Sequence, residues 1–430
     1  APDRKGGPVA DTEPSAIPPS GILPGARRPV PGRSELVVMI AGLMALNAFG
    51  IDIMLPALNE ISHAVGLTAP GMESDNRQQM IIFSYVLGFG APQIIWGPIS
   101  DRFGRRGPLF VALVGYIITA FACIVMRDFM ALLIMRFLQG VFASGGRLVA
   151  VSVVRDLFAG RQMARFMSLV MTIFMVVPIL APGLGQIILF IAPWEATFLV
   201  LAVFGIIMFV WTWYRLPETL PEDARQPLNL GAALGAYGQI VKSRVTFGYM
   251  CASGVIFGAL FSFIASSEQV FREVFGQTET FALWFAGIAG TLACANFLNS
   301  RIVERIGMRR ISQVALFTFT GVAAILTLFT HFAGDHLYVF FPLFALCFGC
   351  FGLMGSNFSA LAMEPLGKIA GTASAAYGFA TTTVSSLIGM AIASQYNGST
   401  IPITLGFVCL GLASLVIILI TEQGKLFSSR

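Results

Sequence analysis

Long apolar runs separated by short polar turns occupy the chain from about residue 36 to residue 420. A run of roughly 20 apolar residues is long enough to cross a bilayer as an α-helix. Twelve such runs are predicted as membrane spans: 36–58, 80–98, 108–125, 130–154, 164–190, 195–214, 245–271, 280–303, 311–332, 337–363, 371–394 and 402–420. The pattern predicts an all-α membrane protein with twelve transmembrane helices.

A charged turn between two of these runs recurs in the second part of the chain. Residues Gly97–Arg106 read G-P-I-S-D-R-F-G-R-R, and a weaker copy, E-R-I-G-M-R-R, occupies Glu304–Arg310. Aligning Asp101 with Glu304 gives an offset of 203 residues, close to half the chain. A repeat of that length predicts two pseudo-symmetric six-helix bundles and argues against short stacked repeats.

The polar stretches divide the chain into five parts. Residues 1–34 are rich in proline, glycine and charge without periodicity, which predicts a disordered cytoplasmic tail. Residues 215–244 are the longest internal polar stretch and are predicted to link the bundles on the cytoplasmic side. The remaining parts are an N-terminal bundle, a C-terminal bundle and a short cytoplasmic tail, at 35–214, 245–421 and 422–430.

Composition and charge exclude a soluble protein and a polyanion-binding one. Of the 430 residues, 56% are hydrophobic and 11% are charged, whereas ordinary globular chains carry about a quarter charged residues. If the Gly97–Arg106 turn is cytoplasmic, most of the 27 Lys and Arg residues fall in the tails and every second loop. That asymmetry is the positive-inside rule. It predicts that both termini are cytoplasmic and that the protein has no nucleic-acid partner.

Chemical motifs for catalysis or metal binding are not apparent in the sequence. No phosphate-binding loop, metal-ligand cluster or nucleophile–base set stands out. The six cysteines all lie within apolar runs, where an oxidising compartment would not reach them. We therefore expect no enzymatic activity, no metal site, no cofactor and no ATP-driven transport.

Ionisable side chains inside a bilayer are costly and usually functional. Three lie clearly within the predicted spans, namely Asp52 in the first and Arg136 and Arg147 in the fourth. Asp52 and Arg136 each lie six residues from the same predicted face, roughly 9 Å deep, so an ion pair is possible. The pair can be a proton site with its partner, or it can only fix the two helices together.

Arg147 follows Arg136 by eleven residues, which places both on one face of the fourth helix. That face, with Gly140 between them and Asn47 on the first helix, is predicted to line a substrate cavity. With Asp52 ionised the cavity carries one net positive charge, which favours neutral or anionic substrates. Alternatively, Arg147 extends toward the bilayer surface, and Asn47 forms a hydrogen bond between helices.

The fifth span contains residues that disfavour a straight helix. Prolines remove backbone donors and glycine removes side-chain bulk. A bend, with tight packing against the other half, is therefore predicted at Pro178, Pro182 and Gly183.

The charged turn is predicted to act as a gating loop. Its candidate residues are Gly97, Asp101, Arg102, Gly104, Arg105 and Arg106. Asp101 can bond helix N-termini or pair with arginines and so latch the two bundles, while the two glycines supply a close approach and a tight turn. The arginines can also serve only to anchor the orientation in the membrane.

Several of these stretches resemble a known family. The Gly97–Arg106 turn resembles the loop between helices 2 and 3 of the major facilitator superfamily. R-F-L-Q-G at Arg136–Gly140 resembles its helix-4 proton-antiporter motif, and V-P-I-L-A-P-G-L-G at Val177–Gly185 resembles its helix-5 exporter signature. Bicyclomycin-resistance-type drug:proton antiporters, the Bcr/CflA group, are similar at Asp52–Leu58, Val153–Phe158 and Gly371–Ala375. One departure is Glu195, where relatives usually have arginine after the tryptophan.

The resemblance covers nearly the whole chain and implies a transporter. It implies proton-coupled antiport of small drug-like compounds across the bacterial inner membrane by alternating access, driven by the proton gradient, as in multidrug efflux and antibiotic resistance. The expected partners are a small-molecule substrate, protons and the lipid bilayer, with the protein as a monomer. A proton-coupled exporter of an organic anion or metabolite is an alternative that the fourth-helix arginines favour. A non-transporting membrane sensor is a third, which the lack of a soluble output domain disfavours.

Overall fold

The fold is described from a computed structural model, which covers residues 30–67, 76–158, 160–225, 235 and 238–427. These residues are helical or irregular, with no strand among them. Residues 1–29 of the predicted first tail, 226–234 and 236–237 of the predicted linker, and 428–430 of the last tail lie outside the described residues.

The N-terminal half contains nine α-helices and two short 3-10 helices in the described ranges. They are α1 (Arg33–Asp52), η1 (Leu55–Ala57), α2 (Leu58–Ala64), η2 (Asn76–Gln79), α3 (Met80–Gly90), α4 (Gln93–Phe103), α5 (Arg106–Val125), α6 (Phe129–Leu157), α7 (Gly160–Phe174), α8 (Val177–Ile191) and α9 (Glu195–Arg215). A short turn, η3 (Glu222–Ala224), follows them.

The C-terminal half consists of six long helices and two short irregular ones in the described ranges. They are α11 (Arg244–Gln269), η4 (Val270–Val274), α12 (Phe281–Ile306), α13 (Met308–Ala333), α14 (Leu337–Met363), η5 (Glu364–Ile369), α15 (Ala370–Ala393) and α16 (Ile401–Thr421). Within the described residues, 11 helices are long and apolar enough to cross a membrane, and a bent pair, Asn76–Gly90 with Gln93–Phe103, supplies a twelfth span. The predicted all-α membrane fold is confirmed.

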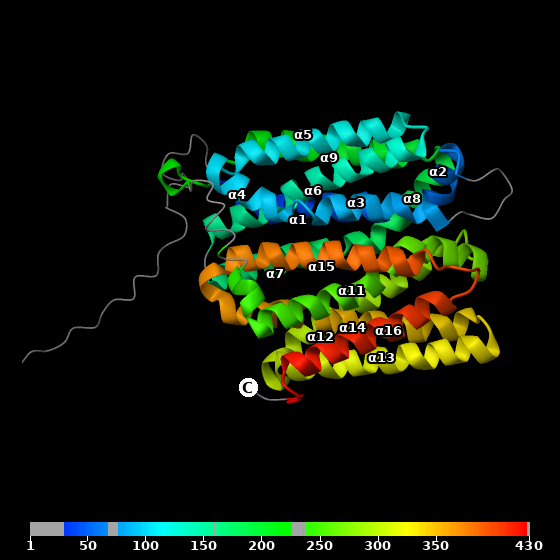
Figure 1. The fold of residues 1–430 in the computed structure, drawn as a ribbon. Coiled ribbons are helices and arrows are strands. Elements are labelled where there is room, and N and C mark those ends of the chain that lie inside the picture. Colours follow the sequence, from blue (N-terminus) through cyan, green and yellow to red (C-terminus); the bar gives the residue numbers. More distant parts are fainter. Residues whose placement is uncertain (1–29, 68–75, 159, 226–234, 236–237, 428–430) are drawn as a thin grey trace, which may run out of the picture.

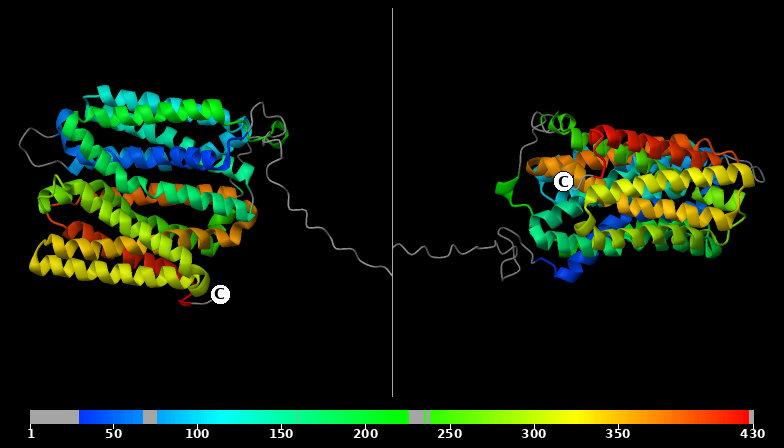
Figure 2. Two further views of the ribbon diagram at one scale, coloured as in Figure 1. Left: turned by 180° about the vertical axis from the view of Figure 1, so that it is seen from behind. Right: turned by 90° about the horizontal axis from the view of Figure 1, so that it is seen from below.

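The two halves lie beside each other as separate bundles (Figure 1), and the same division is visible from behind (Figure 2). Their charged turns have the same backbone geometry, because Gly104 has φ +85° and Gly307 has φ +91°. That region of φ is open to glycine and disfavours other residues. In each half, an acid that follows the last helix contacts the charged turn of the same half. Glu218 accepts a hydrogen bond from the Arg106 amide, and Glu422 pairs with Arg309.

Three spans of the N-terminal half are interrupted just before or at a proline. The first breaks at Ile53–Met54 before Pro56, the second at Ala91–Pro92, and the fifth at Met175–Val176 before Pro178. Proline lacks the amide N–H that would continue the helical ladder. In the fifth span, Pro182 lies inside α8, and Gly183 has open space where a side chain would be.

Close backbone packing in the N-terminal half depends on other glycines. A Cβ on Gly140 would overlap the Tyr85 carbonyl oxygen, and one on Gly88 would overlap that of Phe137, so α3 and α6 pack backbone to backbone. A Cβ on Gly185 would overlap the Ile53 carbonyl oxygen. The tightest backbone approach of the fifth span is therefore at Gly185, against the broken first span, rather than at Gly183. The predicted packing against the other half is also present, because α8 contacts α12.

Polar side chains join the two halves at the face opposite the Gly104 turn. We call the end of the molecule with Gly104 and Gly307 the turn face, and the other end the opposite face. Gln79 donates to the Gln269 side chain at 3.0 Å, and Gln269 donates to Asn76 at 3.1 Å. Asn76 in turn donates to the Tyr396 carbonyl at 2.8 Å. These four residues form what we call the polar seal.

A second polar contact between the halves lies near the polar seal. The amide nitrogen of Gln186 on α8 donates to the carbonyls of Thr278 and Glu279 at 2.9 and 2.7 Å. Its oxygen accepts from the amide of Ala282 at 3.2 Å, in the first turn of α12. The described hydrogen bonds thus hold the halves together at the opposite face.

Gly140→Ala tests the close packing of α3 and α6. We expect a lower melting temperature in detergent, corresponding to about 1–3 kcal/mol of overpacking. Gly146→Ala on the same helix is the control, because a Cβ there meets no atom within 4 Å. Equal melting temperatures of the two variants would contradict the packing described above.

Candidate functional site

The guanidinium of Arg136 is buried at the centre of the N-terminal half, with 0% exposure. One terminal nitrogen donates to the Gly50 carbonyl of α1 at 2.7 Å, and the other donates to the Gln139 side chain at 2.6 Å. The guanidinium carbon also lies 4.3 Å from the centre of the Tyr85 ring on α3. Carbonyl dipoles and an aromatic face therefore compensate the positive charge.

The Gly50 carbonyl is available because α1 ends two residues later. The last carbonyls of a helix have no partner in their own helix, and Pro56 cannot donate a backbone hydrogen bond to Asp52. Arg136 supplies a donor at this break. The break in the first span thus determines what the fourth-helix arginine binds.

Asp52 is the last residue of α1 and is 5% exposed. It forms no hydrogen bond or ion pair with another described residue, and the expected ion pair with Arg136 is therefore not formed in this structure. One reason is that Asp52 lies deeper in its span than expected, because the first span runs to Ala64 and not to residue 58. A second is that the Arg136 donors are already bonded to Gly50 and Gln139.

The residues predicted to line the substrate cavity lie in different surroundings. Arg147 is partly buried, with its guanidinium carbon 5.7 Å from the Phe89 ring centre, and makes no hydrogen bond or ion pair in the described part of the chain. Gly140 is buried against the α3 backbone, which differs from the expected cavity wall. The side-chain oxygen of Asn47 is buried without a described partner.

The face that Arg136 and Arg147 share is directed at α3. Arg136 lies over Tyr85 and Arg147 lies over Phe89, and the two aromatic residues are one helical turn apart. The prediction that both arginines lie on one face agrees with this arrangement, but the first arginine is enclosed by protein atoms.

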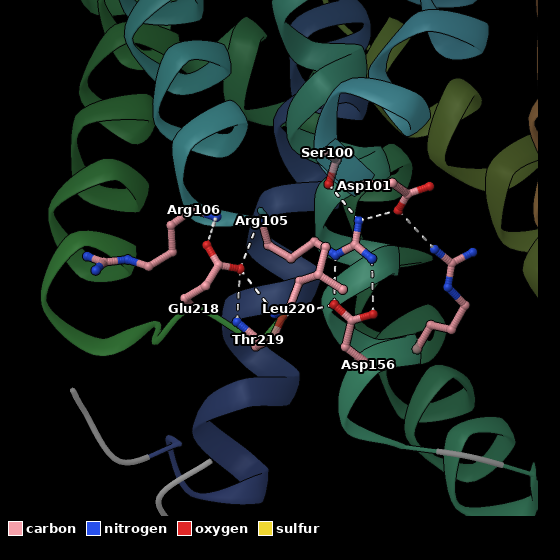
Figure 3. A network of polar contacts seen from close by, with 9 residues as sticks. Ser100, Asp101, Arg105, Arg106, Asp156, Glu218, Thr219 and Leu220 are labelled. Carbon is pink, nitrogen blue, oxygen red and sulfur yellow. Dashed lines mark hydrogen bonds and ion pairs between the residues drawn. The ribbon is translucent and has the colours of Figure 1, made fainter. Parts of the chain in front are cut away.

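Arg105 organises the charged turn at the turn face (Figure 3). Its side chain is 3% exposed and bonds both oxygens of Asp156 at 2.7 and 3.1 Å. It also bonds Asp101 at 2.6 Å and Ser100 at 2.9 Å. Burial lowers the pKa of the Arg105 guanidinium, but the bonds to Asp156 and Asp101 outweigh burial and hold this pKa above its ordinary value.

Glu218 binds the N-terminus of α5. Its carboxylate accepts from the amides of Arg105 and Arg106 at 2.7 and 3.1 Å, as Figure 3 shows. A carboxylate at this position satisfies free amide donors and complements the helix dipole. Gly104 is needed both for its φ and for space, because a Cβ there would lie 2.6 Å from Glu218.

The gating-loop residues divide into two groups in this structure. Asp101, Gly104, Arg105 and the Arg106 amide belong to the network with Asp156 and Glu218. Gly97 has open space around it, and Arg102 is exposed beside Phe103. The contacts described for this network lie within the N-terminal half and the segment after α9, so they form no latch between the bundles in this conformation.

The sequence analysis assigned no role to three acids that make polar contacts in the structure, namely Asp156, Glu218 and Glu268. Asp156 and Glu218 each lie just beyond the end of a predicted span, in V-V-R-D-L-F and R-L-P-E-T, which was the available signal. Glu268 lies within the predicted span 245–271 and is 4% exposed. The arginine four residues later was its signal. Glu195 pairs with Arg127 at 2.9 Å, both partly exposed at the opposite face.

Comparison with known proteins places these features in a family context. A family model described as "Major Facilitator Superfamily" matches residues 40–390. A Bacillus subtilis protein named "Uncharacterized MFS-type transporter YdgK" is 30% identical over 360 residues, which are 83% of this chain and 88% of that protein.

Two further relatives have more specific names. The "Bicyclomycin resistance protein homolog" of Haemophilus influenzae is 28% identical, over 85% of this chain and 91% of its own length. The "Multidrug resistance protein MdtL" of Escherichia coli O157:H7 is 26% identical, over 91% and 97%.

Solved structures share the fold at low sequence identity. A partially occluded inward-open structure of the xylose transporter XylE from E. coli has a TM-score of 0.67 at 14% identity, covering 90% of this chain and 98% of that one. The human organic anion transporter MFSD10 has a TM-score of 0.60 at 18% identity, covering 90% and 100%.

The different surroundings of the two α6 arginines predict different effects on stability. Arg136→Gln should lower the melting temperature strongly, because removing a charged donor from buried acceptors costs about 1.5–3 kcal/mol per bond. Arg147→Gln should change it little, since no described hydrogen bond is lost. Thermal unfolding of both purified variants measures this, and an equally unstable Arg147→Gln would contradict the assignment.

Proposed function

The chain belongs to the major facilitator superfamily, and we propose that it exports small drug-like compounds from the bacterial cytoplasm in exchange for protons. It is a multi-pass membrane transporter. The names of the bicyclomycin-resistance and multidrug-resistance relatives, at 28% and 26% identity, support the substrate class. The likeness to the xylose and organic anion transporters supports the fold alone.

The environment of Asp52 is the observation that carries the proton-coupling proposal. Its carboxyl group is buried at the C-terminal end of α1, without a described partner. A charged carboxylate in such a place loses hydration without gaining a bond, and the negative end of the helix dipole adds to its cost. Protonation removes both costs, so Asp52 can bind a proton whenever water reaches it from one side.

The polar seal supports a transport cycle of the alternating-access type. With the turn face toward the cytoplasm, as the distribution of Lys and Arg predicts, the polar seal closes the outer side. This conformation then receives a compound from the cytoplasm and releases the proton of Asp52 there. Opening of the polar seal lets the compound leave and a proton bind from outside.

A proton-coupled exporter of organic anions is the second candidate, and Arg147 favours it. Its guanidinium has no described hydrogen bond or ion pair within the bilayer-spanning helix α6. A cation without an anionic partner in a low-dielectric region attracts an anionic ligand. Arg147 is therefore the residue that distinguishes the two candidate substrate classes.

Asp52→Asn should abolish proton coupling while leaving the protein folded. The asparagine cannot release a proton, so substrate-induced proton release in liposomes should fall at least tenfold. Exchange of labelled for unlabelled compound, which needs no net proton movement, should persist. Glu222→Gln, at a 90% exposed side chain, is the control. Proton release at the wild-type level in Asp52→Asn would refute the role of Asp52.

Arg147→Gln separates the two substrate classes. If anions are exported, their transport should fall about tenfold or more, because roughly 1.4 kcal/mol of lost binding is a factor of ten. Transport of neutral compounds should remain. Uptake into inverted membrane vesicles with matched neutral, cationic and anionic compounds measures this, and an equal loss for all three would exclude anion recognition by Arg147.

A further inference from the structure

A pocket at the opposite face lies between the two halves, next to the polar seal. Its volume is about 230 Å³. The N-terminal half contributes Pro56, Glu60 and Gln186 to its lining, and the C-terminal half contributes Glu268, Arg272 and Glu279. Because residues of both halves line this pocket, any separation of the halves at this face changes the surroundings of each of them.

Glu268 is the buried acid of this pocket. One of its oxygens accepts a hydrogen bond from Arg272 at 2.7 Å. The other oxygen is buried and has no hydrogen-bond partner among the described residues. A carboxylate that is 4% exposed and bonded at one oxygen only is incompletely compensated.

The other charges facing Glu268 increase this imbalance. Glu60 of α2 and Glu279, just before α12, line the same pocket, and Glu273 shares Arg272 at 3.1 Å. Arg272 therefore pairs with two carboxylates, and two further acids line the same pocket. Like charges disfavour the ionised state of each member of such a group.

Glu268 is also coupled by position to the closure of the halves. It directly precedes Gln269, whose side chain bonds both Gln79 and Asn76 in the polar seal. The π-helical turn η4 begins immediately afterwards, and such turns are frequent at functional sites. Opening the polar seal moves Gln269 away from the N-terminal half and admits water to the free oxygen of Glu268.

We propose that Glu268 is a second proton-binding site, distinct from Asp52, which makes closure of the polar seal dependent on the pH of the outer solution. The free oxygen takes a proton from water at the opposite face as the halves close, and returns it to that side as they open. No net proton crosses the membrane by this step. The orientation rests on the proposed function; the linkage between protonation and closure does not.

The expected consequence follows from the cost of burying a charge. Closing the halves over an ionised Glu268 leaves a half-compensated carboxylate in the pocket, whereas closing them over the protonated acid does not. A lower pH therefore favours the closed opposite face. During proton-coupled export, this linkage speeds the closing of the opposite face after the compound has left, when the proton concentration of the outer solution is high.

The test measures the distance between the halves in the full chain. Spin labels are attached through Val125→Cys and Phe332→Cys, exposed positions on α5 and α13 near the opposite face, with Cys294 and Cys409 replaced by serine. Double electron–electron resonance in lipid nanodiscs without substrate then gives the open fraction from pH 5 to pH 8.5. We expect this fraction to rise at least fivefold with pH in the otherwise wild-type chain.

Glu268→Gln mimics the protonated acid and should stay closed throughout this pH range. Glu279→Gln, an exposed acid of the same pocket, is the matched control and should retain the pH dependence. Asp52→Asn should also retain it, which separates a failure of this inference from a failure of the proposed function. An unchanged pH dependence in Glu268→Gln, or its loss in Asp52→Asn, would overturn the inference.

Arg272→Gln provides a second reading that does not require the Glu268 variant to fold. Removing the cation disfavours the ionised carboxylate, so the opening transition should move to higher pH by about 1 unit or more. A shift to lower pH, or none, would contradict the assignment. Opening that follows sodium concentration at constant pH would show that the pocket binds a metal cation instead, and would also overturn the inference.

Discussion

The burial of the Arg136 guanidinium against a broken helix is the interaction on which the N-terminal half depends. The cation is held by the Gly50 carbonyl, the Gln139 side chain and the Tyr85 ring, none of which is charged. Arg136 therefore joins α1, α3 and α6 without forming an ion pair with a carboxylate. The consequence is that Asp52, two residues from Gly50, has no hydrogen bond or ion pair among the described residues, which is the environment that the proposed proton site requires.

The two halves share a scaffold but use it differently. Each has a glycine of positive φ in its charged turn, and each has an acid after its sixth span that binds that turn. The charges within the spans do not follow the repeat. Arg136 and Arg147 lie on the fourth helix of the first half, whereas the C-terminal half carries Glu268 near the opposite face. In the proposed mechanism, these unequal charges on a repeated scaffold let the N-terminal half bind the proton and the C-terminal half respond to closure.

The contacts between the halves are suited to repeated opening. The polar seal consists of amide side chains and a carbonyl, which can exchange their partners for water at little cost when the halves separate. An apolar contact of the same area would be harder to open, and a buried ion pair would be costly to leave unpaired. Glu268 beside this seal is the exception, and its half-compensated charge gives the equilibrium its proposed sensitivity to protons.

Much of the architecture was predictable because it depends on patterns along the chain. Apolar length determined the twelve spans, the 203-residue repeat indicated two bundles, and the prolines of the fifth span marked the interruption before Pro178, whereas the interruption at Ala91–Pro92 was not predicted. These features follow from backbone chemistry and burial in lipid, which act on each segment by itself. The first span was predicted too short, because Pro56 interrupts the helix without ending the span.

Only the tertiary structure decided the partners of the charged groups. The sequence shows that Asp52 and Arg136 lie within the membrane, but not that a free carbonyl at Gly50 satisfies the arginine first. It likewise does not show that Gly140 faces α3, or that Glu218 reaches the start of α5 from a segment more than a hundred residues later. Partner choice depends on the depth and rotation of neighbouring helices. A shift of one helical turn, which the hydrophobic pattern does not resolve, exchanges one partner for another.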